Sequence, residues 1–226
     1  LCPPNVSNAA HIRRSTPSST VTATPKSDEY LHAKDGRILK DLILFIDSGD
    51  TLVDESTEIR DDTGVVVQAE LIPGAAEAVR TLWRQGYRIA LVADGLRASF
   101  DRIYRQHGLE GCFEARAISG DLGVCKPHAR MFISAMEQMG LTDADKDRIV
   151  MVGNNLERDI AGANRLGLTS ILMSWTTRYR LQPRVPEETP DFVVARPDEL
   201  PALLAELDRQ MKKRRDPASG SAVAGR

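Results

Sequence analysis

The sequence predicts an α/β domain built on a parallel β-sheet. Short, uninterrupted apolar runs alternate along the chain with stretches of helical periodicity, which is typical of alternating strands and helices. The runs are apolar on both faces, so we expect the strands to be buried beneath helices on both sides. Together these observations predict three layers, with helices above and below one sheet.

Five strands are expected from the apolar runs. Four runs cover residues 42–46, 89–92, 149–152 and 170–173. A fifth, at residues 192–195, is expected at the edge of the sheet.

Helices are expected between the strands, where apolar residues recur at a spacing of three or four. Pro73 suits a first helical turn and opens a helix that stops at Gly86. Three more helices end at a glycine, and a last one runs from Leu200 into four cations that suit a helix C-terminus. These four helices cover residues 99–107, 127–139, 157–166 and 200–215.

One segment interrupts this alternation. Residues 57–71 form two short β-like runs around Asp61-Asp62-Thr63-Gly64, just after the first strand. This pattern predicts a hairpin.

The chain divides into a core and two tails. Residues 1–38 are rich in Ser, Thr and Pro, which predicts a flexible arm; a remnant of a targeting peptide is the alternative. Residues 39–212 hold the periodic elements, with the hairpin as a short insertion. Residues 213–226 are expected to form a second flexible tail.

The composition excludes several classes of protein. The 226 residues are 42% hydrophobic with a net charge of -2, as in one globular domain without a field that attracts nucleic acid or an anionic membrane. No stretch is apolar for long enough to span a bilayer. The three cysteines form no C-x-x-C pair, which favours a reducing, cytoplasmic location.

Polar residues follow the expected strands, where ligands bind in an open parallel sheet. They gather after the first, second and third strands, with one lysine at the start of a helix between them. The residues are Asp47, Gly49, Asp50 and Thr51; Ala93, Asp94 and Gly95; Asn154, Asn155 and Asp159; and Lys126. Oxygen ligands facing one ammonium group suit Mg²⁺ and a phosphoryl group.

Four segments resemble the motifs of the haloacid dehalogenase (HAD) superfamily, in the family's order. FIDSGDTL resembles motif I, D-x-D-x-T after an apolar strand, and LVADG resembles motif II. GVCKPHARMF resembles the Lys-Pro motif III, and MVGNNLERDIAGA resembles motif IV, usually G-D-x-x-x-x-D. The resemblance covers about residues 42–175 and implies a Rossmann-like core. Larger members of the family insert a cap domain after the first or the third strand, and neither insertion of this chain has room for one.

The resemblance implies roles for motif residues. Asp47 corresponds to the nucleophile that forms an aspartyl-phosphate. Asp47 would share Mg²⁺ with the backbone carbonyl of Gly49 and with motif IV, through Asn154 and Asp159.

Other positions are expected to handle the phosphoryl group. Lys126 would neutralise its charge, and Thr51 would donate hydrogen bonds to the phosphate or to the loop. Ala93, Asp94 and Gly95 of motif II are expected to bind substrate. Arg178, after the fourth strand, is a candidate to bind an anionic substrate. The alternative is that it belongs to a solvated loop without such a role.

Three departures from the family pattern bear on activity. Gly49 stands where the family's phosphatases carry the Asp that protonates the leaving oxygen, and the carboxylate appears one position later, as Asp50. Ala93 replaces a phosphate-binding Ser or Thr. Asn154 replaces an Asp on the metal, so the affinity for the metal is expected to fall.

These departures lead to a hypothesis about the substrate. Without a general acid, an alkoxide leaving group loses roughly 10²- to 10⁴-fold assistance. We therefore expect a preference for acyl, aryl or anhydride phosphates, unless Asp50 or the substrate supplies the proton. The short insertion predicts an open crevice that admits large substrates or is covered by the hairpin, the N-terminal arm or a partner subunit of a homo-oligomer.

Two functions follow. The first is a Mg²⁺-dependent phosphohydrolase acting on a phosphorylated small molecule or macromolecule. The alternative is a catalytically weakened HAD-like domain that binds a phosphorylated ligand or a protein, for which Gly49, Ala93 and Asn154 are the evidence. Retention of four motif residues favours the enzyme: Asp47, Thr51, Lys126 and Asp159.

Overall fold

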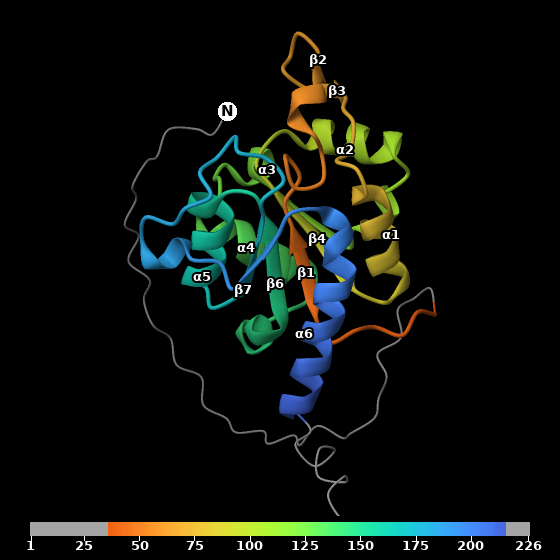
Figure 1. Ribbon diagram of the computed structural model, residues 1–226. Helices are drawn as coiled ribbons and strands as arrows, with labels where there is room; N and C mark the ends of the chain where they lie inside the picture. The colour runs from red at the N-terminus through yellow and green to blue at the C-terminus, as the bar shows by residue number, and fades with distance from the viewer. Residues whose placement is uncertain (1–35, 216–226) are drawn as a thin grey trace, which may run out of the picture.

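The computed structural model describes residues 36–215, which form a six-stranded parallel sheet between two layers of helices (Figure 1). This confirms the predicted fold class. The predicted core, residues 39–212, lies within the described range. The predicted arm lies outside it except for residues 36–38, and so does the predicted tail except for residues 213–215.

The order of the sheet places the first strand at its centre. The order is β5-β4-β1-β6-β7-β8, and every neighbouring pair is parallel. The strands are β1 (Ile43–Ile46), β4 (Arg88–Ala93), β5 (Ala115–Ile118), β6 (Ile149–Gly153), β7 (Thr169–Met173) and β8 (Phe192–Val194). The loops after β1, β4 and β6 therefore leave the sheet side by side.

Strand β5 is absent from the sequence-based expectation. Its sequence, Ala-Arg-Ala-Ile, is interrupted by Arg116, so it does not read as an apolar run. Because β5 is an edge strand, Arg116 is tolerated there: its guanidinium ion-pairs with Asp101 on α2 (Arg97–Gln106).

Alternate side chains of β1 enter the two halves of the core. Leu44 and Ile46 pack with one helical layer, and Ile43 and Phe45 pack with the other. The first layer contains α1 (Ala75–Arg84), α2 and α6 (Leu200–Arg215), and the second contains α4 (Ala129–Gln138) and α5 (Ala161–Arg165). Burial on both faces is the arrangement that the apolar runs predict.

The helix expected over residues 157–166 has two parts. A π-helical turn, η4 (Leu156–Ile160), precedes α5. Such wide turns are rare in proteins, and those that occur often lie at functional sites. Six further short turns or helices lie in the described chain: η1 (Glu55–Thr57), η2 (Glu110–Cys112), α3 (Ser119–Leu122), η3 (Asp143–Arg148), η5 (Pro186–Glu188) and η6 (Pro197–Glu199).

The predicted hairpin is present between β1 and α1. Its strands are β2 (Ile59–Arg60) and β3 (Val66–Gln68), which pair antiparallel. The hairpin is tied to α2, because the Val66 amide donates to Ser99 Oγ at 2.9 Å. It projects at the end of the molecule where β1 finishes (Figure 1). Within residues 36–215 no helix is long and apolar enough to cross a membrane.

Two glycines provide a test of whether the segment at Ile38, which precedes β1, packs against the end of α1. Gly86 and Gly140 follow the ten-residue helices α1 and α4 and have φ values of 92° and 67°. A β-carbon at Gly86 would lie 1.9 Å from the Ile38 carbonyl oxygen, whereas one at Gly140 would meet nothing within 4 Å. Both substitutions to Ala force a left-handed backbone, but only the first also forces two backbones apart.

We expect Gly140→Ala to lower the free energy of unfolding by about 1–2 kcal/mol, the cost of a left-handed backbone. Gly86→Ala should cost about 2–4 kcal/mol, because displacement of the Ile38 segment is added to that cost. Urea denaturation followed by circular dichroism measures both. Equal losses would show that the segment at Ile38 does not pack against Gly86.

Candidate active site

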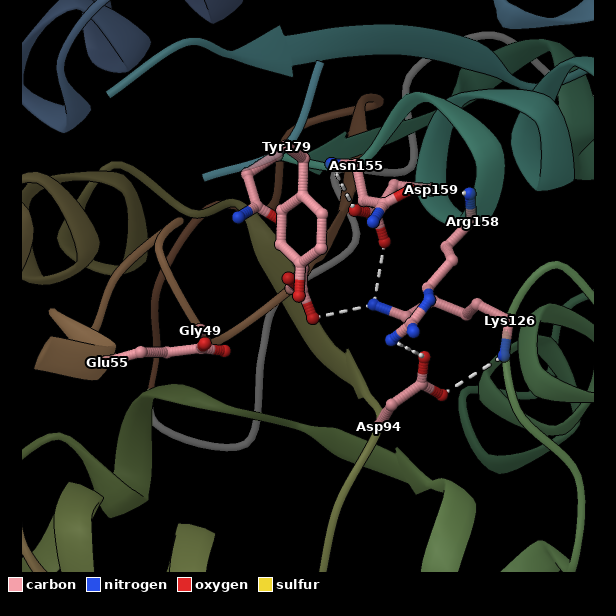
Figure 2. Close-up of a pocket in the computed structure, with 10 residues that line it drawn as sticks. Gly49, Glu55, Asp94, Lys126, Asn155, Arg158, Asp159 and Tyr179 are labelled. Carbon is pink, nitrogen blue, oxygen red and sulfur yellow. Dashed lines mark hydrogen bonds and ion pairs between the residues drawn. The ribbon is translucent and has the colours of Figure 1, made fainter. Parts of the chain in front are cut away.

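A strongly polar pocket opens at the carboxyl ends of the central strands (Figure 2). Its lining comes from the loops after β1, β4, β6 and β7 and from the start of the segment before α4. The lining residues are Asp47, Gly49, Glu55, Asp94, Lys126, Asn154, Asn155, Arg158, Asp159 and Tyr179. Seven of the residues predicted from the sequence thus meet in one place, as the strand order requires.

Lys126 occupies the floor of this pocket. Its Nζ lies 2.6 Å from Asp47 Oδ1 and 2.7 Å from Asp159 Oδ1, and it donates to the Val92 carbonyl at 2.9 Å. The Lys126 side chain is 2% exposed, so these three contacts replace its hydration. The two carboxylates are drawn together by an ammonium group that lies between them.

The charges around Lys126 keep it protonated. Burial lowers the pKa of its ammonium group, but Asp159, Asp47 and Asp94 raise it by more, so the pKa of Lys126 is raised overall. Burial also raises the pKa of Asp94, and Lys126 opposes that rise. The lysine is therefore a fixed positive charge beside the Asp47 carboxylate.

The loop after β1 fixes the orientation of Asp47. Thr51 Oγ1 donates to Asp47 Oδ2 at 3.4 Å, and the Ser48 carbonyl accepts from the amides of Leu52 and Val53 at 2.8 and 2.9 Å. Thr51 is buried under the loop and does not line the pocket. Of its two predicted roles, the contacts therefore favour bonding within the loop.

The π-helical turn brings Asp159 into the site. Its Oδ2 accepts from the Asn155 amide at 2.9 Å, and the Asn155 side chain accepts from the amides of Glu157 and Arg158. A β-carbon at Gly153 would lie 2.2 Å from Asp159 Cγ, so only glycine allows this approach. Both oxygens of Asp159 thus have protein partners, which does not support its predicted role as a direct metal ligand.

Motif II contributes one side chain to the pocket. Asp94 Oδ1 accepts from the Lys126 amide at 3.0 Å, and Asp94 Oδ2 lies 3.7 Å from an Arg158 nitrogen. Ala93 is buried at the end of β4, and the Gly95 amide donates to Ser119 Oγ at 2.8 Å. Neither Ala93 nor Gly95 lines the pocket, so of the three only Asp94 is placed to meet a ligand.

The structure argues against Asp50 as the proton donor. Asp50 is buried, has a left-handed backbone with φ 49° and does not line the pocket. Its carboxylate accepts from the Glu55 amide at 3.2 Å and ion-pairs with Arg178. Arg178 forms this ion pair and lies 3.7 Å from Glu55, which lines the pocket. Arg178 does not line the pocket itself.

Sequence reasoning missed three residues of the pocket lining. Glu55, Arg158 and Tyr179 belong to none of the motif positions, and no periodicity marks them. A signal existed only for Arg158, which lies between the motif IV residues Asn154 and Asp159. Figure 2 shows Glu55 and Lys126 on opposite sides of the pocket.

The Glu55 carboxyl group holds a proton more readily than an ordinary glutamate. Burial is the main cause, and the negative charges of Asp50, Glu58 and Asp47 add to it, so the pKa of Glu55 is raised to about 7. Arg178 opposes the rise.

The pocket can accept a divalent cation. Four acids and two basic side chains line it, so the pocket carries an excess of two negative charges when all six are ionised. Asp47, the carbonyl of Gly49 and the amide of Asn154 provide oxygen donors of the kind that Mg²⁺ prefers. In the described part of the chain no three His, Cys, Asp or Glu side chains form a metal-binding group, so the donor set would be one carboxylate with neutral oxygens.

Comparison with known proteins agrees with this geometry. Residues 9–167 match the family of haloacid dehalogenase-like hydrolases. The chain belongs to this family.

Its relatives include phosphatases. It is 30% identical over 136 residues to glyceraldehyde 3-phosphate phosphatase of Methanopyrus kandleri, covering 60% of this chain and 57% of the relative. It is 29% identical to haloacid dehalogenase-like hydrolase domain-containing protein 3 of Xenopus laevis, covering 74% and 66%. The chain therefore spans between about half and two thirds of the curated relatives.

Solved structures share the fold. An HAD hydrolase of Bacillus subtilis bound to magnesium superposes with a TM-score of 0.59 at 18% identity, covering 72% of this chain and 98% of that one. At this identity the likeness supports the fold alone.

The burial of Lys126 between carboxylates leads to a prediction about stability. Lys126→Met leaves two buried carboxylates without a counter-charge, so we expect a loss of about 3–5 kcal/mol in the free energy of unfolding. Adding Asp159→Asn should restore part of that loss. Urea denaturation in EDTA is the measurement.

Arg84→Met is the matched control. It removes a cation from an exposed pair with Glu77, so we expect a loss below about 1 kcal/mol. If the Lys126 and Arg84 variants lose the same small amount, the buried cluster does not hold the site together.

Proposed function

We propose that this HAD-family protein is a Mg²⁺-dependent phosphohydrolase that acts through an aspartyl-phosphate on Asp47. One observation carries the proposal: the Asp47 carboxylate ends the central strand inside an open polar pocket, 2.6 Å from a buried ammonium group. A carboxylate held beside a fixed positive charge can accept an anionic phosphoryl group. The charge pattern of the pocket is the reason for proposing the cation.

Each residue of the site has its own role in the proposed reaction. Asp47 attacks phosphorus, and Lys126 offsets the charge that gathers on the phosphoryl oxygens. Thr51 holds the Asp47 carboxylate in place through its hydroxyl group. Asp47, the Gly49 carbonyl and Asn154 would hold Mg²⁺, which supplies electrostatic screening between the carboxylate and the incoming phosphate.

The substrate class is a phosphate monoester or anhydride, carried by a small molecule or by a macromolecule. Only the η1 turn and the hairpin lie between β1 and α1, so within residues 36–215 no large cap domain at this point narrows the choice of substrate. A large substrate, or a partner subunit of a homo-oligomer over the crevice, belongs to the same proposal, as does a cytoplasmic location. The preference for good leaving groups is expected from the sequence because Asp50 is the only carboxyl group of the protein considered there as a proton donor near position 49. The carboxyl group of Glu55 also lies beside Gly49, so it is a second candidate donor.

The second candidate is a weakened domain that binds a phosphorylated ligand or a protein without efficient turnover. Gly49, Ala93 and Asn154 favour it, because each removes a group with which the family handles phosphate, metal or proton. The intact cluster of Asp47, Lys126 and Asp159 favours the enzyme.

Turnover by the parent and by Asp47→Asn separates the two candidates. With Mg²⁺, we expect hydrolysis of members of a panel of phosphate esters and anhydrides. Asp47→Asn should lose at least about 10³-fold in kcat, because the amide cannot form the covalent intermediate. Activity that persists in Asp47→Asn contradicts the mechanism, and a folded parent that binds but does not turn over phosphate esters supports the weakened domain.

The amide at position 154 leads to a prediction about the metal. EDTA should abolish hydrolysis, and Mg²⁺ should restore it. Asn154→Asp adds a second carboxylate to the donor set, so the Mg²⁺ concentration for half-maximal activity should fall about tenfold. Titration of activity with Mg²⁺ measures this concentration, and an unchanged or higher value would remove Asn154 from the proposed donor set.

A further inference from the structure

Cleavage of a phosphate ester leaves negative charge on the departing oxygen. A proton donor beside that oxygen speeds the departure of an alkoxide by about 10²–10⁴-fold. If the protein is a phosphatase, as proposed above, one of the four carboxyl groups in the pocket is the natural donor.

Three of these four groups are already committed. Asp47 forms the bond to phosphorus. Asp94 accepts from the Lys126 amide at 3.0 Å and lies 3.7 Å from Arg158. Asp159 is 1% exposed and contacts Lys126 Nζ at 2.7 Å. Asp94 and Asp159 each hold a hydrogen bond or a short ion pair that they would have to give up to reach a substrate oxygen.

Glu55 differs from the other three carboxyl groups. Its nearest charged partner among residues 36–215 is Arg178, at 3.7 Å, which is beyond hydrogen-bond distance. Its side chain is 31% exposed and lines the same pocket as Asp47. A group in this setting is free to meet the oxygen of a bound substrate.

The position of the Glu55 carboxyl group is specific. A β-carbon added to Gly49 would lie 1.9 Å from Glu55 Oε1 and 2.7 Å from Glu55 Cδ. The Glu55 carboxyl group therefore fills the space that a side chain at residue 49 would occupy, and Figure 2 shows it beside Gly49. Gly49 is the residue that makes room for it, two positions after Asp47.

Neighbouring groups hold the Glu55 segment in this position. Asp50 Oδ1 accepts from the Glu55 amide at 3.2 Å, and Asp50 Oδ2 binds Arg178. Asp54 caps the η1 turn that begins at Glu55, by accepting from the Ser56 amide at 2.9 Å. Asp50 and Arg178 are thus positioning residues for Glu55.

We propose that Glu55 is the general acid and base of this site, in place of a carboxylate at position 49. As Asp47 bonds to phosphorus, the bond from phosphorus to the ester oxygen breaks, its electron pair stays on that oxygen, and the Glu55 proton passes to it. The alcohol leaves, and Glu55 remains as a carboxylate.

Glu55 then takes a proton from water as the water oxygen bonds to phosphorus. The bond between phosphorus and Asp47 breaks, and its electron pair returns to the Asp47 carboxylate. Inorganic phosphate leaves with Glu55 protonated again.

A leaving-group series on Glu55→Gln tests the first step. The substrates are aryl and alkyl phosphates of graded leaving-group pKa, assayed with Mg²⁺ and compared by kcat/KM. We expect Glu55→Gln to lose about 10²- to 10⁴-fold with alkyl phosphates and far less with p-nitrophenyl phosphate, whose leaving group needs no proton. A loss of the same size for every substrate overturns the proposal, because it indicates a structural role.

Moving the carboxyl group back to position 49 provides a rescue test. Glu55→Ala empties the space beside Gly49, and Gly49→Asp in that background places a carboxyl group there. We expect the double variant to exceed Glu55→Ala at least tenfold with alkyl phosphates and to match it with p-nitrophenyl phosphate. Gly49→Asp alone should lower turnover, because its side chain and Glu55 compete for one space. A double variant no better than Glu55→Ala counts against the proposal.

Glu77→Gln is the matched control. Glu77 ion-pairs with Arg84 on α1 and does not line the pocket, so its variant should change kcat/KM less than threefold for all substrates. An inactive parent, or an active Asp47→Asn, refutes the proposed function and this proposal with it. An active parent and an inactive Asp47→Asn, with equal losses across the series in Glu55→Gln, refute only the role of Glu55.

Discussion

The ion-pair cluster of Lys126 with Asp47 and Asp159 is the constraint on which the site depends. A buried ammonium group needs nearby carboxylates, and buried carboxylates need the ammonium group, so none of the three is stable there alone. The cluster joins the ends of β1 and β6 to the segment before α4. Its geometry also leaves Asp47 beside a permanent positive charge, which is the condition for attack on an anionic phosphoryl group.

A second group of charges organises the rim of the pocket. Buried Asp50 binds Arg178 and the Glu55 amide, so it links the loop after β7 to the loop after β1. The apparent transposition in motif I, Gly-Asp instead of Asp-Gly, then has a physical explanation. Gly49 leaves space for the carboxyl group of Glu55, and Asp50 holds the backbone from which that group extends.

The sequence predicts the sheet and the central cluster well, for a simple reason. Apolar runs mark the strands, and the carboxyl ends of adjacent parallel strands must lie together, so Asp47, Asp94 and Asn154 are placed by topology alone. Strand β5 escaped prediction because Arg116 breaks its pattern at a sheet edge. The part played by Glu55 depends on a left-handed residue and a short capped turn, and neither leaves a periodic signal in the sequence.

The central claim is that Asp47 takes the phosphoryl group. Acid quenching during turnover, followed by borohydride reduction and peptide mass spectrometry, tests it directly, because borohydride converts an aspartyl-phosphate to homoserine. We predict homoserine at position 47 only when substrate and Mg²⁺ are both present. Sustained hydrolysis without modification at that position, or with the modification on another residue, would contradict the account.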